Sequence, residues 1–178
     1  PIWLNRTPYS VRPYGVDNYP EPKGALKFYG RDRFIFAFQD VRGRYGSEGE
    51  FMHVRPLSSG SGPNESTDTY DTIEWLLKHV PNHNDKVGLS GISYPGFYAA
   101  GGAVDSHPAL KAVSPQAPIG DWFVGDDFHH NGTLYLAHAY NFLFQFEPKL
   151  EKPTRETPKA FDYETPNGYE FYLNLGPL

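Results

Sequence analysis

The sequence contains no cysteine, only one methionine, no cluster of basic residues and no long apolar run. Without cysteine, the chain has no disulfide bond, no thiolate zinc site and no cysteine nucleophile. The net charge is -5 and no run of lysine or arginine is present, which argues against a nucleic-acid partner. No stretch approaches the roughly 20 apolar residues of a membrane-spanning helix. These absences leave the localisation open.

Aromatic residues are plentiful, by contrast. The chain has 13 tyrosines and 13 phenylalanines among its 178 residues, and 39% of its residues are hydrophobic. Such a composition is too apolar for a disordered chain, and the length suffices for one domain with a sizeable core. We therefore expect a folded protein.

Short apolar runs indicate the strands of a sheet. They span residues 2–4, 33–38, 87–89 and 112–113. The run at 33–38 is apolar throughout after its first residue, which is typical of a strand buried on both faces of a parallel sheet.

Helical patterns lie between these runs. Four apolar residues recur at helical spacing after a turn-forming loop at 58–66, namely Ile73, Leu76, Leu77 and Val80. Asp68 or Asp71 is expected to cap this helix, and Pro81 to end it. A short helix is expected over residues 96–105. The alternation of strands and helices predicts an α/β fold with a parallel sheet.

The character of the chain changes after Pro118. Residues 135–146 are apolar nearly all round, residues 147–166 are charged and rich in proline, and residues 169–175 are aromatic. No second strand-helix unit is visible there. We interpret this part as the beginning of a helical cap.

The segment GISYPGF, residues 91–97, places Ser93 between an apolar strand and a predicted helix. A serine on such a turn, with glycines around it, is the nucleophile arrangement of α/β-hydrolases. The spacing here is G-x-S-x-x-G, one residue longer than the usual G-x-S-x-G. The alternative is a glycine-rich turn with an ordinary serine.

A second polar segment, QDVRGRYGSEGE, follows the apolar run at 33–38. The carboxyl ends of parallel strands share one edge, so this loop and Ser93 are expected to face the same space. Tyr45 then becomes a candidate hydrogen-bond donor to an oxyanion, beside the main-chain N–H of Tyr94. The alternative is a salt-bridged loop in which Tyr45 only packs at the surface.

A third polar segment, residues 125–130, combines two aspartates with two histidines. Neighbouring residues rarely point at one ion, so we expect no metal here and no other cofactor. Two readings remain: a carboxylate that recognises a substrate amine, or a solvated helix-capping pair.

Taken together, five segments resemble the Xaa-Pro dipeptidyl-peptidase-like serine hydrolases. This family includes cocaine esterase, the α-amino acid ester hydrolases and the cephalosporin acylases, and it uses the unusual G-x-S-Y-x-G form. The segments occur in the family's order: RTPY (6–9), QDVRGRYGSEGEF (39–51), GISYPGF (91–97), HPALKAV (107–113) and GDDFHHNG (125–132).

The resemblance implies a role for each candidate residue. Ser93 would be the acylated nucleophile, and Tyr45 with the N–H of Tyr94 would form the oxyanion hole. Asp127 matches a carboxylate that binds the substrate ammonium group in the α-amino acid ester hydrolases. Asp105 and His107 would be helix-end residues outside the catalytic triad.

The same resemblance implies that this chain is an internal piece of an α/β-hydrolase. Residues 1–132 would be part of the catalytic domain, and residues 133–178 the beginning of the helical cap. The triad follows the order serine, acid, histidine, and family members place the last two far beyond Leu178. Asp162 and His138 would make a poor triad, so we expect little or no activity from this piece alone.

The expected function is hydrolysis of an ester, an amide or an X-Pro peptide bond through an acyl-enzyme. The substrate would be a small molecule or a short peptide, and a homo-oligomer is compatible with the sequence. One alternative is a non-catalytic ligand-binding module or degenerate paralogue. Another, an α/β domain that binds phosphate, is weakened because neither G-x-G-x-x-G nor a G-K-[ST] ending is present.

Overall fold

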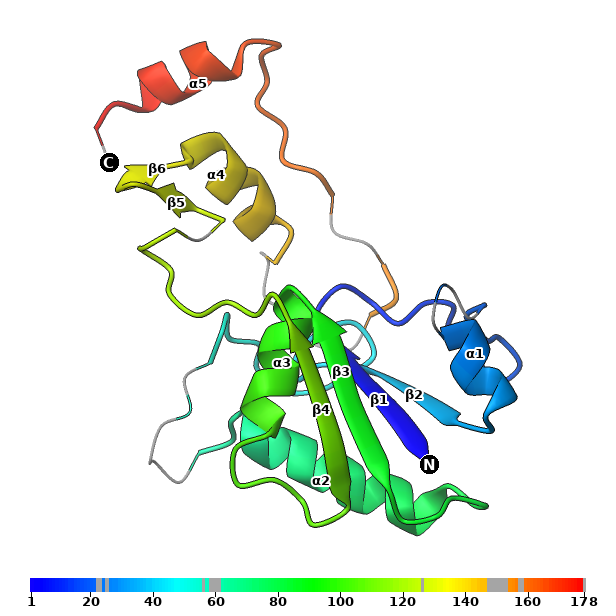
Figure 1. The fold of residues 1–178 in the computed structure, drawn as a ribbon. Coiled ribbons are helices and arrows are strands. Elements are labelled where there is room, and N and C mark those ends of the chain that lie inside the picture. Colours follow the sequence, from blue (N-terminus) through cyan, green and yellow to red (C-terminus); the bar gives the residue numbers. More distant parts are fainter. Residues whose placement is uncertain are drawn as a thin grey trace. The chain divides into compact units, whose positions relative to one another are not determined.

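The computed structural model describes residues 1–21, 24, 26–55, 57, 62–125, 127–146, 154–156 and 159–177. The chain forms two compact units (Figure 1). The first unit comprises Pro1–Ile119 and Leu150–Arg155, and the second comprises Gly120–Lys149 and Glu156–Leu178. The prediction that residues 1–132 and 133–178 belong to two domains of a longer parent protein stays a prediction.

The first unit is built on a parallel sheet, as the apolar runs predicted. Its strands are β1 (Ile2–Thr7), β2 (Ile35–Asp40), β3 (Val87–Ile92) and β4 (Leu110–Gln116). They lie in the order β2-β1-β3-β4, and every neighbouring pair is parallel. The carboxyl ends of all the strands therefore meet at one edge of the sheet.

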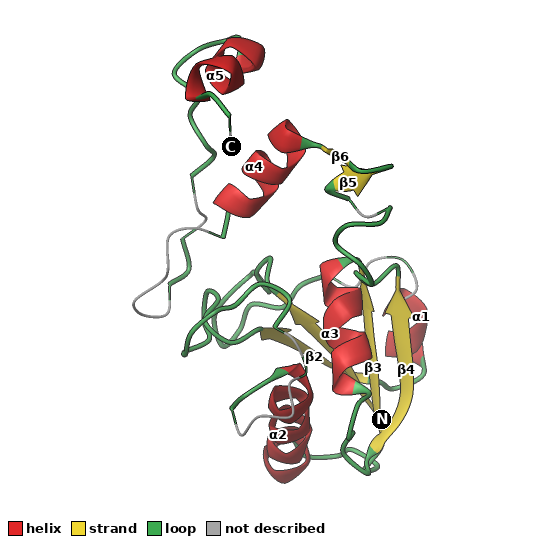
Figure 2. Cartoon of the chain, turned by 90° about the vertical axis from the view of Figure 1, so that its left-hand side faces the viewer, coloured by secondary structure: helices red, strands yellow, loops and turns green. Residues whose placement is uncertain are grey.

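Helices cover both faces of this sheet. The helices α2 (Glu65–His79) and α3 (Tyr94–Gly102) lie on one face, and α1 (Leu26–Arg31) lies on the other (Figure 2). The buried core fills the space between the sheet and the helices α2 and α3. It consists of Ile2, Leu4, Ile73, Leu76, Val87, Leu89, Ala99 and Ala109. The sequence pattern did not predict α1, because so short a helix shows no repeating apolar face.

The start of α2 corrects the sequence-based prediction. The cap is Asn64 rather than Asp68 or Asp71, and the Asn64 side chain accepts hydrogen bonds from the amides of Ser66 and Thr67. The Thr67 hydroxyl in turn accepts from the Asn64 amide at 2.9 Å, which completes a capping box. Residues 65 and 66 thus belong to the helix and not to the loop, while residues 58–61 lie outside the described part of the chain.

The second unit is small and aromatic. A short hairpin of β5 (His129–His130) and β6 (Thr133–Leu134) precedes α4 (Leu136–Phe144), which lies within the predicted segment at 135–146. The last helix, α5 (Gly168–Leu175), covers the aromatic segment. Of the charged segment at 147–166, residues 147–153 and 157–158 lie outside the described residues.

Ring packing holds the helices of the second unit together. The Phe161 ring lies 4.8 Å from the ring of Tyr140, 4.9 Å from that of Phe144 and 5.5 Å from that of Phe171. Across both units, none of the described helices is long and apolar enough to cross a membrane.

Candidate active site

Ser93 stands on a sharp turn between β3 and α3. Its backbone has φ 63° and ψ -124°, a region that residues other than glycine rarely occupy. The side chain is exposed and makes no capping hydrogen bond to the helix that follows. Backbone strain of this kind persists only where the surrounding structure enforces it, and it occurs often at functional sites.

Two glycines make this turn sterically accessible. A Cβ atom at Gly91 would lie 2.2 Å from the carbonyl oxygen of Pro95, and one at Gly96 would lie 2.4 Å from the carbonyl oxygen of Gln116. Both distances are far below van der Waals contact, so neither position accepts a side chain without movement. This explains the longer G-x-S-x-x-G spacing. Residue 96 is where α3 comes close to the end of β4, so the glycine is needed at that position.

Tyr45 lies in the loop that follows β2. It is buried, with 6% of its surface exposed, and it has a positive φ of 42°. The Asp40 carboxylate organises this loop by accepting hydrogen bonds from the Gly46 amide at 3.1 Å and the Tyr14 hydroxyl at 2.7 Å. Ser93 follows β3 and Tyr45 follows β2, and these two strands flank β1 and end at the same edge of the sheet. That both residues face the same space stays a prediction.

The alternative for this segment was a loop held together by its own salt bridges, with Tyr45 packed at the surface. Arg42 does not pair within the loop but binds Asp68 of α2 through two nitrogen atoms, at 2.9 Å and 2.5 Å. Burial of Tyr45 also argues against its packing only at the surface.

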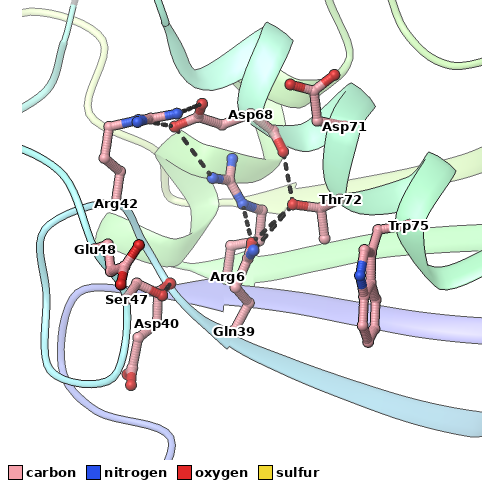
Figure 3. Close-up of a pocket in the computed structure, with 10 residues that line it drawn as sticks. All are labelled: Arg6, Gln39, Asp40, Arg42, Ser47, Glu48, Asp68, Asp71, Thr72 and Trp75. Atoms are coloured by element: carbon pink, nitrogen blue, oxygen red, sulfur yellow. Dashed lines mark hydrogen bonds and ion pairs between the residues drawn. The ribbon is translucent and has the colours of Figure 1, made fainter. Parts of the chain in front are cut away.

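A buried charged network lies beneath this loop, beside a polar cavity of about 330 Å³ (Figure 3). At its centre is Arg6, which is 1% exposed and donates hydrogen bonds to Gln39 at 2.8 Å and Thr69 at 2.6 Å. Its guanidinium also forms ion pairs with Glu65 at 3.5 Å and Asp68 at 3.9 Å. The network joins β1, β2 and α2 below the carboxyl edge of the sheet.

Burial disfavours the charged forms of the side chains in this network. Desolvation lowers the pKa of Arg6 below its usual value, although the neighbouring carboxylates of Glu65 and Asp68 act to raise it. Desolvation raises the pKa of Glu65 above 4.5, against the attraction of Arg6. These charges therefore depend on one another for their stability in the interior.

The side chain of Tyr94 makes contacts that the sequence did not reveal. Its hydroxyl accepts a hydrogen bond from the Val54 amide at 3.0 Å and lies 3.3 Å from Nδ1 of His53. Its ring meets that of Tyr9 edge-on at 6.1 Å. No local pattern marks His53 or Val54, because their proximity to Tyr94 depends on the path of a long loop.

His107 lies away from this edge. It precedes the amino end of β4, whereas Ser93 follows the carboxyl end of the parallel strand β3. Its Nε2 lies 2.8 Å from the Glu74 carboxylate, and its ring lies 4.7 Å from that of Tyr70. These contacts give His107 a role in packing α2 against the turn before β4.

The segment at 125–130 belongs to the second unit. Asp127 is exposed there, and Asp126 lies outside the described residues. Nδ1 of His129 lies 2.8 Å from the Trp122 carbonyl oxygen, and Nδ1 of His130 lies 3.1 Å from the Tyr135 hydroxyl. Within the described ranges, no three metal-ligating side chains gather into a site.

Comparison with solved structures defines the class of fold as that of α/β-hydrolases. An aminopeptidase from the marine sediment archaeon Thaumarchaeota archaeon matches 98% of this chain with a TM-score of 0.76 and 32% identity. A selenomethionine-labelled α-amino acid ester hydrolase also matches 98% of it, with a TM-score of 0.78 and 32% identity. The matched region is 29% of each of those chains.

Sequence comparison then gives the family. Residues 1–167 match the X-Pro dipeptidyl-peptidase (S15) family, and the chain belongs to this family. Cocaine esterase from Rhodococcus sp. (strain MB1 Bresler) is 29% identical over 135 residues, which cover 75% of this chain and 21% of the esterase. The chain therefore spans less than a third of the length of these relatives.

Proposed function

We propose that this chain carries the nucleophile and the oxyanion hole of a serine hydrolase that cleaves ester, amide or X-Pro peptide bonds. The observation that carries the proposal is the strained, exposed Ser93 between β3 and α3, with φ 63° and a glycine two residues before it. The names of the similar proteins, an aminopeptidase, an ester hydrolase and cocaine esterase, agree in describing hydrolysis of ester or peptide bonds.

The chemistry follows from the groups at this edge. The Ser93 hydroxyl oxygen attacks the carbonyl carbon of the substrate, while a base takes its proton and passes it to the leaving alcohol or amine. The negative charge on the carbonyl oxygen is stabilised by the Tyr45 hydroxyl and the Tyr94 amide. Water then attacks the acyl-enzyme, releasing the acid and restoring the serine.

The base and its acid partner lie outside these residues in this proposal, as the family resemblance implies. His107 is engaged with Glu74 at the opposite edge of the sheet. We therefore expect the 178-residue chain alone to lack turnover, because a serine without its base retains only the catalysis supplied by the oxyanion hole and binding.

The test is covalent capture of Ser93 in the full-length natural protein. A serine-directed fluorophosphonate should add one adduct, seen by intact mass and located to the peptide with Ser93, and Ser93→Ala should abolish it. Ser114→Ala is the control, because Ser114 is an exposed serine in the middle of β4. A protein that binds ester-like ligands but forms no adduct would be a non-catalytic or degenerate member of the family.

A further inference from the structure

Two buried tyrosines on α3 differ in one respect. Tyr94 and Tyr98 lie one turn apart, each is 1% exposed, and their rings stack with centroids 5.3 Å apart. The Tyr94 hydroxyl accepts the Val54 amide proton at 3.0 Å and lies beside His53. The Tyr98 hydroxyl is buried, and the polar group that acts on it is the Tyr94 hydroxyl rather than a group of the loop. Only the first of these phenols connects the helix to the loop at 51–55.

This loop is connected in turn to Tyr45. The guanidinium of Arg44 lies 5.0 Å from the centre of the Tyr45 ring and 5.2 Å from that of Phe51. The Phe51 ring meets the His53 ring at 5.0 Å. Packing is therefore continuous from Tyr45 to the residue next to Val54.

The hydrogen bond at Val54 holds a strained backbone. Val54 has a φ of 40°, which is unusual for a β-branched residue. Burial raises the pKa of Tyr94 to about 12, so its hydroxyl stays protonated at neutral pH. A neutral phenol accepts one hydrogen bond and still donates its own proton, so it satisfies the Val54 amide and has a donor for an acceptor such as Nδ1 of His53.

We propose that the Tyr94 hydroxyl is a positioning group for the oxyanion hole. Tyr94 offers one donor through its amide, and its side chain fixes the loop at 51–55, which packs against the second donor, Tyr45. The separation of the two donors is then set by one residue. This inference rests on the proposed function, because only an oxyanion requires both donors at once.

Two substitutions that each remove a single oxygen test the proposal in the full-length protein. Tyr94→Phe keeps the amide, the stacked ring and the contact with Tyr9, and it should lower kcat by about 10-fold or more with KM nearly unchanged. Tyr98→Phe removes a buried hydroxyl that does not bond the loop at 51–55, and it should leave kcat within about two-fold. Hydrogen exchange of the peptide that contains Val54 should accelerate in the first variant only.

The outcomes separate this inference from the proposed function. Wild-type kcat in Tyr94→Phe, or an equal loss in Tyr98→Phe, would overturn the positioning role even though Ser93 is labelled. If Ser93 is not labelled in the wild type, the proposed function fails, and the positioning role fails with it. Hydrogen exchange then still shows whether the hydroxyl anchors the loop.

A folding defect is distinguished by the unfolding midpoint in urea. If Tyr94→Phe does not fold, hydrogen exchange in the wild type tests whether the Tyr94 hydroxyl anchors the loop. An anchored Val54 amide exchanges more slowly than the other amides of the loop. Fast exchange of Val54 in the wild type would overturn the proposal.

Discussion

The main-chain amide of Ser93 donates a hydrogen bond to the carbonyl oxygen of Gln116 at 2.9 Å. Gln116 is the last residue of β4, so this bond fixes the turn after β3 to the end of the neighbouring strand. The same carbonyl oxygen closes the space above Gly96. The position of the nucleophile thus depends on the contact between the start of α3 and the end of β4.

Gly96→Ala tests this contact. The added methyl group would lie 2.4 Å from the Gln116 carbonyl oxygen, which belongs to the backbone and cannot rotate away. We expect a destabilisation of about 1–3 kcal/mol in urea unfolding, typical of overpacking, together with slower phosphonate labelling of Ser93. Gly120→Ala is the matched control, because nothing lies within 4 Å of the added methyl there. Equal stability of the two variants would contradict the argument.

Tyr45→Phe tests the oxyanion hole. The substitution keeps the ring beside Arg44 and removes only the hydroxyl. If that hydroxyl stabilises the oxyanion, kcat should fall by roughly 10²-fold while KM changes little, since the donor acts mainly in the transition state. Tyr29→Phe on α1, at the opposite face of the sheet, serves as the control. A kcat within two-fold of the wild type would remove Tyr45 from the mechanism.

Local patterns predicted the sheet and the elbow because both depend on neighbouring residues. Apolar runs marked all the strands of the parallel sheet, and the glycines around Ser93 marked its turn. The contacts of His53 and the pairing of Arg42 with Asp68 were not predictable in this way. They join residues that are distant in sequence, and the sequence gives no spacing rule for them.

The start of α2 shows a different reason for error. Asp68 and Asp71 are both ordinary capping residues, and the polar stretch before them resembles a loop. Asn64 prevails because it forms a reciprocal capping box with Thr67. Asp68 is then free to face inward, where it pairs with Arg42 and Arg6.

Arg6 should contribute more to stability than Arg42, although both pair with Asp68. Arg6→Met leaves the buried carboxylates of Glu65 and Asp68 without their central cation, which should cost about 3–5 kcal/mol. Arg42 is 37% exposed, so Arg42→Met should cost about 1 kcal/mol or less. Urea unfolding of the two variants gives the comparison. An equal loss in both would show that Arg6 does not hold the network together.

Asp127→Asn tests the predicted ammonium site. If this carboxylate binds a substrate ammonium group, the variant should have a higher KM for esters with a free α-amino group. The KM for the same esters with an acetylated amino group should not change, because the charge that the carboxylate would attract is absent. A uniform change for both substrates would assign Asp127 to general folding of the second unit.

Glu65 should make stability depend on pH in a direction opposite to that of most carboxylates. Desolvation raises its pKa above 4.5, and the charges that surround it are those of Arg6, Asp68, Arg55 and Arg42. The folded protein therefore holds the proton more tightly than the unfolded chain. The resulting stabilisation is complete below the pKa of the unfolded chain and is lost as the pH rises through the pKa of the folded state.

Glu65→Gln isolates this effect, because glutamine has a similar shape and does not ionise. The free energy of unfolding of the wild type, minus that of Glu65→Gln, should fall as the pH rises from about 4 toward 7. The same difference for Asp71→Asn, at an exposed acid on α2, should stay nearly flat. If the difference in unfolding free energy between the wild type and Glu65→Gln instead increases with pH, the prediction is wrong. The attraction of Arg6 for the Glu65 carboxylate would then outweigh the cost of removing that carboxylate from water.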